Sequence, residues 1–389
     1  MHVLVHALAA RRFGGAARHL HGFLRALEDW ASDVQFTVFV DREFLVQKGS
    51  IGYDRSPNVT VVPVASESAA RRVYWDQVTL PRLARQRRAD AIWSILGFGP
   101  GWNPSRVSIL NFQRTPTYYC RYHLGTLRPR ERAVTLLRRQ MQYLGMRAAH
   151  RVITPTDGMR TMVRGVYPRL PAAKFATIPH AFEPDTLRAP VPLPAHVDAL
   201  MPAGDWDGVR LVYVGHLLPY KGLDTLLSAL AIAQKRSPRP LRAYLTVAPE
   251  DWAEGYRTFL HRRDELGLTE VVTMLGKVPE HSVAEIYRRA DVLAFPSLCE
   301  SFGWPVMEAM SFGLPVIAAA TPVNQEQVGD AGLYYAPGDA AAAADHLVRL
   351  VGDADLRAAL AQRGRVRVEQ VRVTWRDYVR RCLLATADP

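Results

Sequence analysis

The sequence predicts an α/β protein with two Rossmann-like, doubly wound domains that face each other across a cleft. Its 389 residues exceed the size at which a single hydrophobic core usually divides. Short β-rich runs alternate with helical patterns along the chain, which is typical of parallel sheets covered by helices. A proline-rich stretch interrupts the alternation near the middle, and the same alternation then resumes.

The first half of the chain contains seven β-rich runs, separated by helical patterns such as 16–30 and 71–87. The runs that predict strands are 2–7, 34–40, 59–64, 91–95, 107–111, 151–154 and 176–178. The pattern then stops, and five prolines followed by two glycines crowd the stretch up to residue 208. We therefore expect an N-terminal domain over 1–185 and a linker over 186–208.

The second half repeats the alternation and predicts a second domain over 209–373. Its strand runs are 210–214, 243–247, 271–275, 292–295, 315–318 and 333–335. A helix is expected over 223–234, because its leucines share one face, and Ser282 with Glu285 forms a capping box that opens another helix. The closing helices are expected over 339–351, 355–371 and 375–384. Ligands of such sheets bind beyond the carboxyl ends of the strands, so we expect the site in the cleft.

The composition excludes several classes of protein. The 49 lysines and arginines exceed the 37 aspartates and glutamates, which gives a net charge of +12. No run approaches the ~18 apolar residues of a membrane-spanning helix, and the N-terminus lacks the basic region of a signal peptide. The three cysteines, Cys120, Cys299 and Cys382, are far apart and form no CxxC pair, which argues against disulfides and structural zinc. We expect a cytoplasmic protein.

The positive charge gathers in the segment 121–151, which carries eight arginines and a single acid. The segment predicts a helix with apolar positions at Val134, Leu137, Met141 and Leu144. Such a helix either lies on an anionic membrane or polymer, or presents a solvated face in an arginine-rich protein. The membrane alternative implies a peripheral place on the inner face of the membrane. Nucleic acid is not expected, because no helix-turn-helix, RNA-binding or zinc-finger pattern accompanies the charge.

The most informative stretch is 295–317, where a strand, a glycine-containing loop and a helix start follow one another. Free backbone N–H groups at Phe302 and Gly303, with the helix dipole, favour a phosphate or a polar sugar rim. The carboxylates of Glu300 and Glu308 can each accept two hydrogen bonds from a diol. Together the loop, the helix start and the two acids would hold a molecule with phosphate in the middle and polyol at both ends, and a sugar nucleotide has that form. The plainer interpretation is two solvated acids near a helix N-terminus.

A second strand–loop–helix junction lies at 214–223. Gly215 lets backbone approach a ligand closely, Lys221 can neutralise a diphosphate, and His216 can donate to the same group. The alternative is a surface lysine and a histidine that fills a turn. Because both junctions follow strands of one predicted sheet, the binding interpretation is favoured.

These segments resemble the C-terminal half of the family-four retaining glycosyltransferases, which have the GT-B fold. The hallmark of the resemblance is the E-x7-E element formed by Glu300 and Glu308, and the similarity is specific over about 209–371. It is carried by GHLLPYKG, LGKVPEHSVAEIYRRADVLAFPS, CESFGWPVMEAMSFGLPVI and DAGLYYAPGDA. In the N-terminal half, the looser similarities are FGGAARHL, RADAIWS, RVITPTDGMR and KFATIPHAFEPD. The tail 374–389 resembles the helix that crosses back onto the first domain.

The resemblance implies roles for individual residues. Glu300 would contact the hydroxyls of the transferred sugar, Glu308 the ribose, and Lys221 the diphosphate as it leaves. His216 is the third candidate catalytic residue, and it departs from the family, which usually has arginine there; a histidine is a weaker, pH-dependent phosphate partner. The residues expected around the donor are Ser301, Phe302, Gly303, Gly215, Val278, Gly14 and Gly15.

Two further departures lie in the N-terminal half. The strand that often ends in histidine in this family here offers Asn111 and Gln113, and the usual Asn-Gly after Ile-Pro is His180-Ala181. We interpret His180 as structural. The residues expected on the acceptor side are Arg11, Arg12, Phe13 and Asn111.

The expected reaction transfers a hexose from a nucleotide-diphosphate sugar of the UDP, GDP or dTDP type to an acceptor hydroxyl. The resemblance implies retention at the anomeric carbon, without a metal or other cofactor, in cell-surface polysaccharide or glycolipid biosynthesis. The enzyme alternatives are a secondary-metabolite glycosyltransferase, a sugar-nucleotide epimerase and a glycosidic phosphorylase on the same fold. The non-enzyme alternative is a protein that binds an anionic membrane or polyanion.

Overall fold

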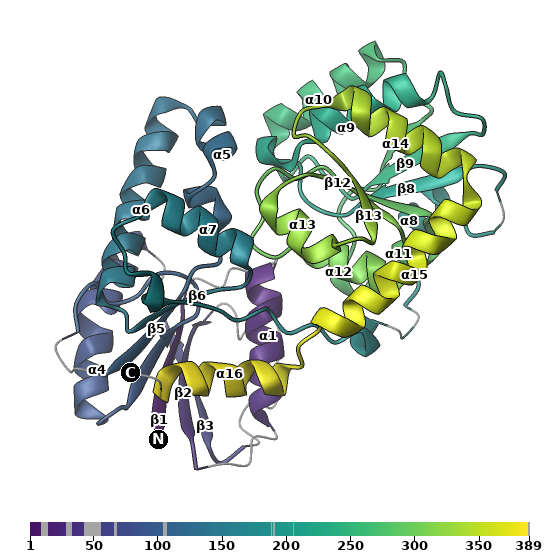
Figure 1. Cartoon of the computed structure of the whole chain (residues 1–389). Helices are drawn as coiled ribbons and strands as arrows, with labels where there is room; N and C mark the ends of the chain where they lie inside the picture. The colour runs from purple at the N-terminus through teal and green to yellow at the C-terminus, as the bar shows by residue number, and fades with distance from the viewer. Residues whose placement is uncertain are drawn as a thin grey trace. The chain divides into compact units, whose positions relative to one another are not determined.

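The structure is a computed structural model, and it divides into two compact units (Figure 1). Unit 1 comprises Met1–Phe182 and Val373–Pro389, and unit 2 comprises Glu183–Arg372. The residues that the structure describes are 1–8, 15–28, 33–42, 56–65, 68–103, 107–187, 189, 191–204 and 206–387.

Unit 1 is built on a seven-stranded parallel sheet with the order β3-β2-β1-β4-β5-β6-β7. The strands are β1 (His2–Ala7), β2 (Gln35–Asp41), β3 (Val59–Val64), β4 (Ala91–Ser94), β5 (Ser108–Phe112), β6 (Arg151–Thr154) and β7 (Phe175–Thr177). β4 is buried along its whole length, as expected for a parallel sheet with both faces covered. The strand order reverses between β1 and β4, which makes their carboxyl ends the switch point of this sheet.

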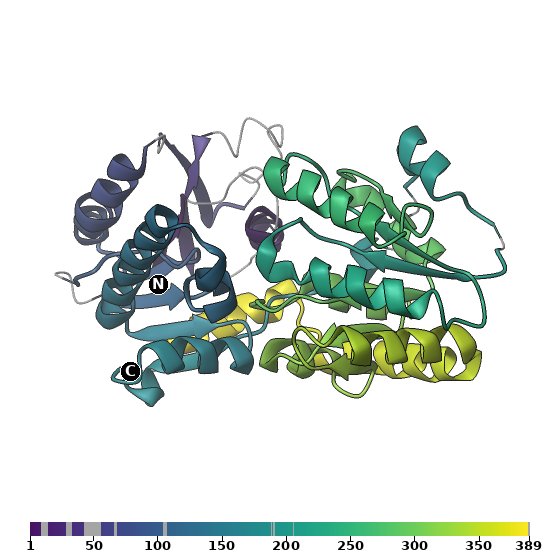
Figure 2. The same cartoon turned by 90° about the horizontal axis from the view of Figure 1, so that it is seen from above.

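The helices of unit 1 come from both ends of the chain. They are α1 (Gly15–Glu28), α3 (Ala69–Tyr74), η1 (Trp75–Thr79), α4 (Leu80–Gln86), η2 (Pro116–Tyr118), α5 (Arg121–Thr126), α6 (Pro129–Ala148), α7 (Asp157–Val166), η3 (Ala172–Lys174) and α16 (Trp375–Ala387). The last of these, α16, packs against α1 and β5 (Figures 1 and 2). Its Tyr378, Val379 and Cys382 enter the same hydrophobic core as Phe23 and Trp93, so the C-terminal segment completes unit 1.

Unit 2 contains a six-stranded parallel sheet with the order β10-β9-β8-β11-β12-β13. The strands are β8 (Val209–Tyr213), β9 (Leu241–Leu245), β10 (Val272–Met274), β11 (Val292–Phe295), β12 (Val316–Ala319) and β13 (Gly332–Tyr335). α9 packs beside α14, whereas α12 packs beside α11 and α15 (Figure 1). The helices are η4 (Pro184–Leu187), α8 (Ala195–Leu200), η5 (Pro219–Lys221), α9 (Leu223–Ala233), α10 (Ala253–Glu265), η6 (Glu280–Ser282), α11 (Val283–Arg289), α12 (Trp304–Ser311), α13 (Pro322–Val328), α14 (Ala340–Gly352) and α15 (Ala354–Val371).

The predicted fold class is confirmed, since both units are doubly wound α/β structures and each predicted strand is present with its ends within two residues. The helix predicted over 71–87 contains a π-helical turn, η1, and the basic segment forms two helices, α5 and α6. The predicted capping box at Ser282 is wrong: its hydroxyl donates to the carbonyl of Pro192, 3.1 Å away, and caps no helix. The last two residues of the helix predicted over 16–30 lie outside the described residues.

The stretch expected to be a linker is a structured part of unit 2. It carries η4 and α8, and Arg289 of α11 forms an ion pair with Asp198 of α8 at 2.8 Å. Arg289 also donates to the carbonyl of Met201 at 2.6 Å. The described residues of this stretch therefore pack onto the unit that follows them.

Candidate active site

Two loops meet at the switch point of the unit 2 sheet, where β8 and β11 are neighbours. One loop leads from β8 through η5 into α9, and the other leads from β11 into α12. They are joined by a hydrogen bond from Leu298 N–H to the carbonyl of Tyr220, 2.9 Å long. A Cβ at Gly222 would lie 2.2 Å from the carbonyl oxygen of Pro296, so the loops approach as closely as they do only because this residue is glycine.

Lys221 and Glu300 form an ion pair between these loops. Lys221 Nζ lies 2.6 Å from Glu300 Oε1, and the two side chains are 17% and 12% exposed. Burial by itself would lower the pKa of Lys221, but the Glu300 carboxylate and the neighbouring tyrosines outweigh burial and raise this pKa above its ordinary value. Lys221 is therefore a fixed positive charge, held against the carboxylate of Glu300.

Glu308 lies inside α12 and is buried, where its Oε2 accepts a hydrogen bond from the Tyr287 hydroxyl at 2.9 Å. α12 begins after Gly303, whose φ of +82° is a left-handed conformation that favours glycine, and Pro305 occupies its first turn. It ends before Gly313, with a φ of +77°. These terminators set the bounds of α12 and so place Glu308 in its second turn.

His216 is held by the buried carboxylate of Asp251. His216 Nδ1 lies 2.9 Å from Asp251 Oδ1, and the two side chains are 58% and 3% exposed. Tyr213 lies beneath this loop and donates its hydroxyl to the His216 carbonyl at 2.8 Å. Burial raises the pKa of Tyr213; the neighbouring charges that act on it are those of Lys221, which lowers it, and of Glu300 and Asp251, which raise it. The candidate catalytic residues thus surround one buried phenol.

The other residues predicted to bind the donor lie in the same loops or near them. The Phe302 ring is buried and packs edge-on against Trp304, with ring centroids 5.3 Å apart, so its predicted contact with a ligand rests on its backbone. Ser301 is half-buried in the acidic loop, and Val278 is half-buried in the loop after β10. A Cβ at Gly215 would lie 2.8 Å from the Tyr213 hydroxyl, which explains the need for glycine there.

Four of the residues predicted in the N-terminal half lie outside the described residues: Arg11, Arg12, Phe13 and Gly14. Gly15 is the first residue of α1. Asn111 lies at the end of β5 and is buried in a network of amides, where its Oδ1 accepts from Gln113 Nε2 at 2.5 Å. The Tyr119 hydroxyl lies 2.5 Å from Gln113 Oε1 in the same network. The Asn111 side chain therefore supports the strand end from within unit 1.

Several residues that organise this site were not found by sequence reasoning. They include Tyr213 and Asp251, and also Asn324, whose Nδ2 donates to the carbonyls of Ser297 at 3.0 Å and Ala319 at 2.9 Å. Tyr213 and Asn324 do carry a signal, because each lies at a strand end or helix start beside the predicted motifs. Asp251 carries none, because the site residues that it holds, Leu217 and His216, are 34 and 35 residues away in the chain. Among the described residues, no three His, Cys, Asp or Glu side chains gather as metal ligands would.

Solved structures share this architecture over the whole chain. HepE from Anabaena, solved in complex with UDP and glucose, matches with a TM-score of 0.69 at 18% identity and covers 100% of both chains. Sucrose-phosphate synthase from Thermosynechococcus elongatus matches with a TM-score of 0.72 at 20% identity and covers 98% of both. The two units with their switch-point loops define a protein of the GT-B fold.

Two family models match the two units in turn. The model "Glycosyltransferase Family 4" matches residues 13–186, and the model "Glycosyl transferases group 1" matches residues 206–367. The chain therefore belongs to family four of the glycosyltransferases, as the E-x7-E resemblance predicts.

Curated relatives match over a shorter stretch. D-inositol 3-phosphate glycosyltransferase from Corynebacterium efficiens is 35% identical over 156 residues, which is 39% of this chain and 37% of the relative. O-antigen chain mannosyltransferase B from Escherichia coli is 32% identical over 170 residues, which is 42% of each. The chain thus matches only about two fifths of the length of these curated relatives.

Proposed function

We propose that this protein transfers a sugar from a nucleotide-diphosphate sugar to an acceptor hydroxyl, with retention at the anomeric carbon. The observation that carries the proposal is the Lys221–Glu300 pair at the switch point, with the buried Glu308 in the second turn of the helix that follows the Glu300 loop. The Lys221 cation matches a diphosphate, the Glu300 carboxylate matches a sugar, and the Glu308 carboxylate matches a ribose. Family membership and the UDP and UDP-glucose complexes of HepE support a nucleotide-sugar donor.

In this proposal the site works by electrostatic stabilisation. Negative charge would grow on the departing diphosphate, and we assign its stabilisation to Lys221, His216 and the N-terminus of α12. The Lys221 ammonium and the helix N-terminus are the reason that we propose a reaction without a metal. Glu300 would orient the sugar hydroxyls, and Glu308 would hold the ribose. Similarity to O-antigen chain mannosyltransferase B favours an acceptor from cell-surface polysaccharide or glycolipid biosynthesis.

A panel of UDP-, GDP- and dTDP-sugars tests the proposal, first by binding and then by turnover. Lys221→Met should lower kcat by roughly 10²-fold or more, because it removes a cation that acts on the leaving group. Glu308→Gln should raise KM about tenfold, because a charged hydrogen bond to the ribose is lost. The controls are Lys235→Met and Glu270→Gln, two exposed residues of the same unit whose loss should change neither constant.

The alternatives give different results in the same assay. Conversion of a donor to its epimer without any acceptor would identify an epimerase, and dependence on inorganic phosphate would identify a phosphorylase. A product with inverted anomeric configuration, read by NMR, would contradict the retaining reaction. Full activity of Lys221→Met and Glu308→Gln would remove the site altogether.

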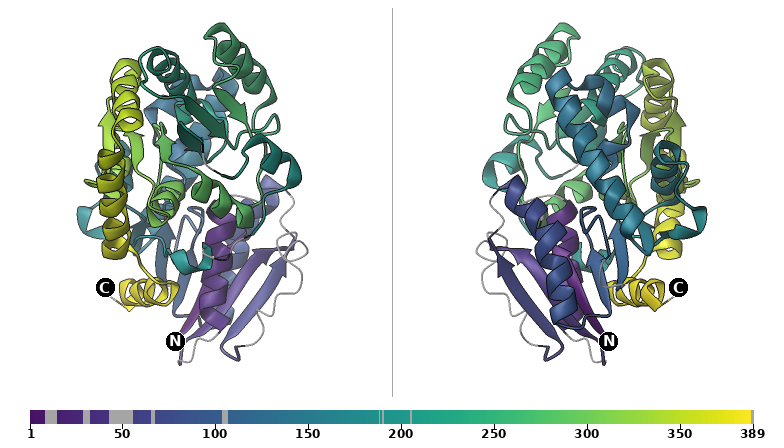
Figure 3. Two further views of the ribbon diagram at one scale, coloured as in Figure 1. Left: turned by 90° about the vertical axis from the view of Figure 1, so that its right-hand side faces the viewer. Right: turned by 90° about the vertical axis from the view of Figure 1, so that its left-hand side faces the viewer.

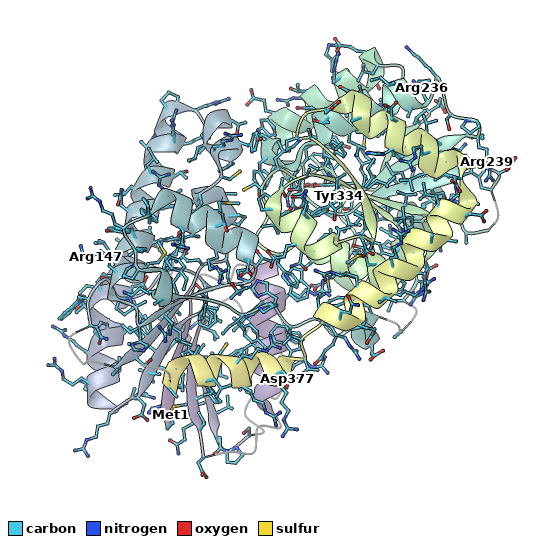
Figure 4. All side chains as sticks on the ribbon, viewed as in Figure 1. Met1, Arg147, Arg236, Arg239, Tyr334 and Asp377 are labelled. Carbon is cyan, nitrogen blue, oxygen red and sulfur yellow. The ribbon has the colours of Figure 1, made fainter. Side chains whose placement is uncertain are left out.

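A second observation favours a membrane partner. Three of the four predicted apolar positions of α6 are exposed: Val134 is 43%, Leu137 65% and Leu144 48% exposed. Exposed arginines accompany them, and Arg147 projects away from the fold (Figure 4). Arginines interleaved with exposed leucines match an anionic lipid surface better than a polyanion, which offers nothing apolar.

Further exposed aromatic and basic residues lie on the same side of unit 1. α4 and α6 both lie on the side of unit 1 that is turned toward the viewer in the right-hand view of Figure 3. The stretch between β4 and β5 carries the exposed Trp102, and a Cβ at the neighbouring Gly101 would lie 3.2 Å from Leu144 Cβ. No helix among the described residues is long and apolar enough to cross a bilayer. We therefore propose that this face docks peripherally on an anionic membrane.

Flotation with phosphatidylcholine vesicles, with and without phosphatidylglycerol, tests the docking. Binding should require phosphatidylglycerol and weaken with salt, and Arg130→Gln with Arg138→Gln should cost about 1 kcal/mol per charge. Leu137→Ser with Leu144→Ser should also abolish binding, whereas the equally exposed Leu384→Ser on α16 should not. Binding that depends on the arginines alone, and extends equally to heparin, would identify a polyanion surface and contradict the membrane proposal.

A further inference from the structure

His216 occupies the position where the resemblance predicts an arginine, and the structure gives it a partner. The Nδ1 atom faces the Asp251 carboxylate at 2.9 Å, while more than half of the side chain stays exposed. No hydrogen-bond partner of His216 Nε2 occurs among the described residues. One ring nitrogen is thus occupied by the protein, and the other is open to a ligand.

The Asp251 carboxylate is itself fixed by the backbone. Its second oxygen, Oδ2, accepts hydrogen bonds from Leu217 N–H at 3.1 Å and from Ala248 N–H at 3.3 Å. These bonds leave Oδ1 directed at His216, and the buried carboxylate has no water layer in which to reorient. The His216 backbone is also held, by the Tyr213 hydroxyl on its carbonyl.

This arrangement determines which nitrogen carries a proton. An ionised carboxylate only accepts hydrogen bonds, so Nδ1 must be the donor. Nε2 is then a bare acceptor in the neutral ring and an N–H donor in the imidazolium. Only the imidazolium can donate to a phosphate oxygen, and Asp251 lies where it balances the charge of that form.

We propose that Asp251 is a positioning residue, which aims His216 Nε2–H at the diphosphate of the donor and so lets a histidine serve where relatives use arginine. The inference rests on the proposed function, since it concerns the same leaving group. It deepens that function by naming the residue that compensates for the departure at position 216. An arginine carries its charge and its donors without help, so it would need no such partner.

The rival explanation is purely structural. Asp251 closes the turn after β9 through its two backbone hydrogen bonds, and losing them would disturb the loop whichever residue stood at 216. Asp251→Asn separates the two roles. The asparagine oxygen still accepts from both backbone N–H groups, but its neutral amide no longer balances an imidazolium.

The experiment is a cycle of four proteins: the wild type, Asp251→Asn, His216→Arg and the double variant. Each is measured for dissociation of inorganic pyrophosphate and for kcat with a nucleotide sugar. In the histidine background, Asp251→Asn should weaken pyrophosphate binding and lower kcat by about tenfold or more, the scale of one charge-assisted hydrogen bond. In the arginine background the same change should matter by about twofold or less.

The tautomer gives a readout that does not depend on activity. Two-bond ¹H–¹⁵N correlations of the His216 ring should show the proton of the neutral form on Nδ1 in the wild type and lose this preference in Asp251→Asn. Equal losses in both backgrounds would show a structural role and overturn the inference, as would an Asp251→Asn variant that behaves like wild type. If the pyrophosphate cycle shows the coupling but no sugar is transferred, the positioning role stands and the proposed reaction fails.

Discussion

Whether a buried titratable side chain of this protein keeps its charge depends on whether it has a partner. Lys221 faces Glu300 and keeps its charge, because the carboxylate outweighs the cost of burial. His19 on α1 is fully buried under α16, and neither of its ring nitrogens has a partner among the described residues. Its ring packs edge-on against His180, Trp375 and Tyr378. His180 is structural, as predicted from the sequence: it is buried and accepts from Arg114 Nε at 3.2 Å.

The two histidines should make unit 1 sensitive to acid. Burial, followed by the charge of Arg114, lowers the pKa of both His19 and His180 well below the ordinary value of 6.5. Both are therefore neutral in the folded protein, so the unfolded chain binds more protons as the pH falls. The stabilisation that comes from keeping both histidines neutral is fully present above pH 6.5. It is lost as the pH falls from 6.5 toward the lowered pKa values of the folded protein. The unfolding midpoint of unit 1 should drop between about pH 7.5 and about pH 5.

His19→Leu should reduce this acid sensitivity. The leucine fills similar space and breaks no hydrogen bond, so stability near neutral pH should change by less than about 1 kcal/mol. Thermal unfolding across the pH range measures both effects, and His196→Leu, at an exposed position, is the control that should leave the pH profile unchanged. An unaltered profile in His19→Leu would place the acid sensitivity elsewhere.

At the level of elements, the site depends on where helices begin. Both α9 and α12 start directly after a left-handed glycine, Gly222 with a φ of +69° and Gly303 with a φ of +82°. Each glycine turns the chain sharply from a strand-end loop into a helix, which leaves the preceding side chains beside the sheet edge. The positions of Lys221 and Glu300 follow from these two turns.

Gly222→Ala should therefore damage both the fold and the site. The new Cβ meets the carbonyl oxygen of Pro296 at 2.2 Å, and alanine is also strained at this φ, so unit 2 should lose about 2 kcal/mol or more. Gly267→Ala is a matched control, because its φ is +67° but nothing lies within 4 Å of the new Cβ. Gly267→Ala should lower the free energy of unfolding of unit 2 by about 1 kcal/mol, and it should leave nucleotide binding unchanged. Equal unfolding midpoints for the two variants would contradict the close contact between the loops.

The elements also show where sequence reasoning holds. Strands were predicted well, because a buried parallel strand is a short run of β-branched and aromatic residues between polar turns. The capping box at Ser282 failed because a distant carbonyl, that of Pro192, competes for the same hydroxyl. The apolar pattern of 71–87 predicts only a helix, and the π turn η1 within it is a finding of the structure.

For the whole molecule, the C-terminal helix belongs to the unit at the opposite end of the chain. Trp93 Nε1–H on β4 donates to Thr386 Oγ1 at 2.9 Å, and the Ser108 hydroxyl donates to the Thr386 carbonyl at 3.0 Å. The Phe182 N–H donates to the carbonyl of Val373 at 2.9 Å, so the two chain segments that enter unit 1 are bonded together. Unit 1 cannot complete its core before α16 is made.

Thr386→Val should thus weaken unit 1 and leave unit 2 unchanged. The substitution keeps the volume but leaves the buried Trp93 N–H without an acceptor, which costs about 1–3 kcal/mol. Calorimetry should show two unfolding transitions, and only the transition of unit 1 should move to a lower temperature. Thr258→Val on α10 is the control, since that hydroxyl is exposed and bonds within its own helix. A shift in both transitions would mean that the units do not unfold separately.

By itself the sequence determined the strand content, the two-unit plan and the motifs at the ends of β8 and β11. These follow from periodicity and from residues close together in the chain, which local physics governs. The tertiary structure alone decided that Lys221 pairs with Glu300, that Asp251 holds His216 and that the apolar stripe of α6 is exposed. Those outcomes join residues tens of positions apart, or depend on which helix face finds a partner, and no local pattern contains that information.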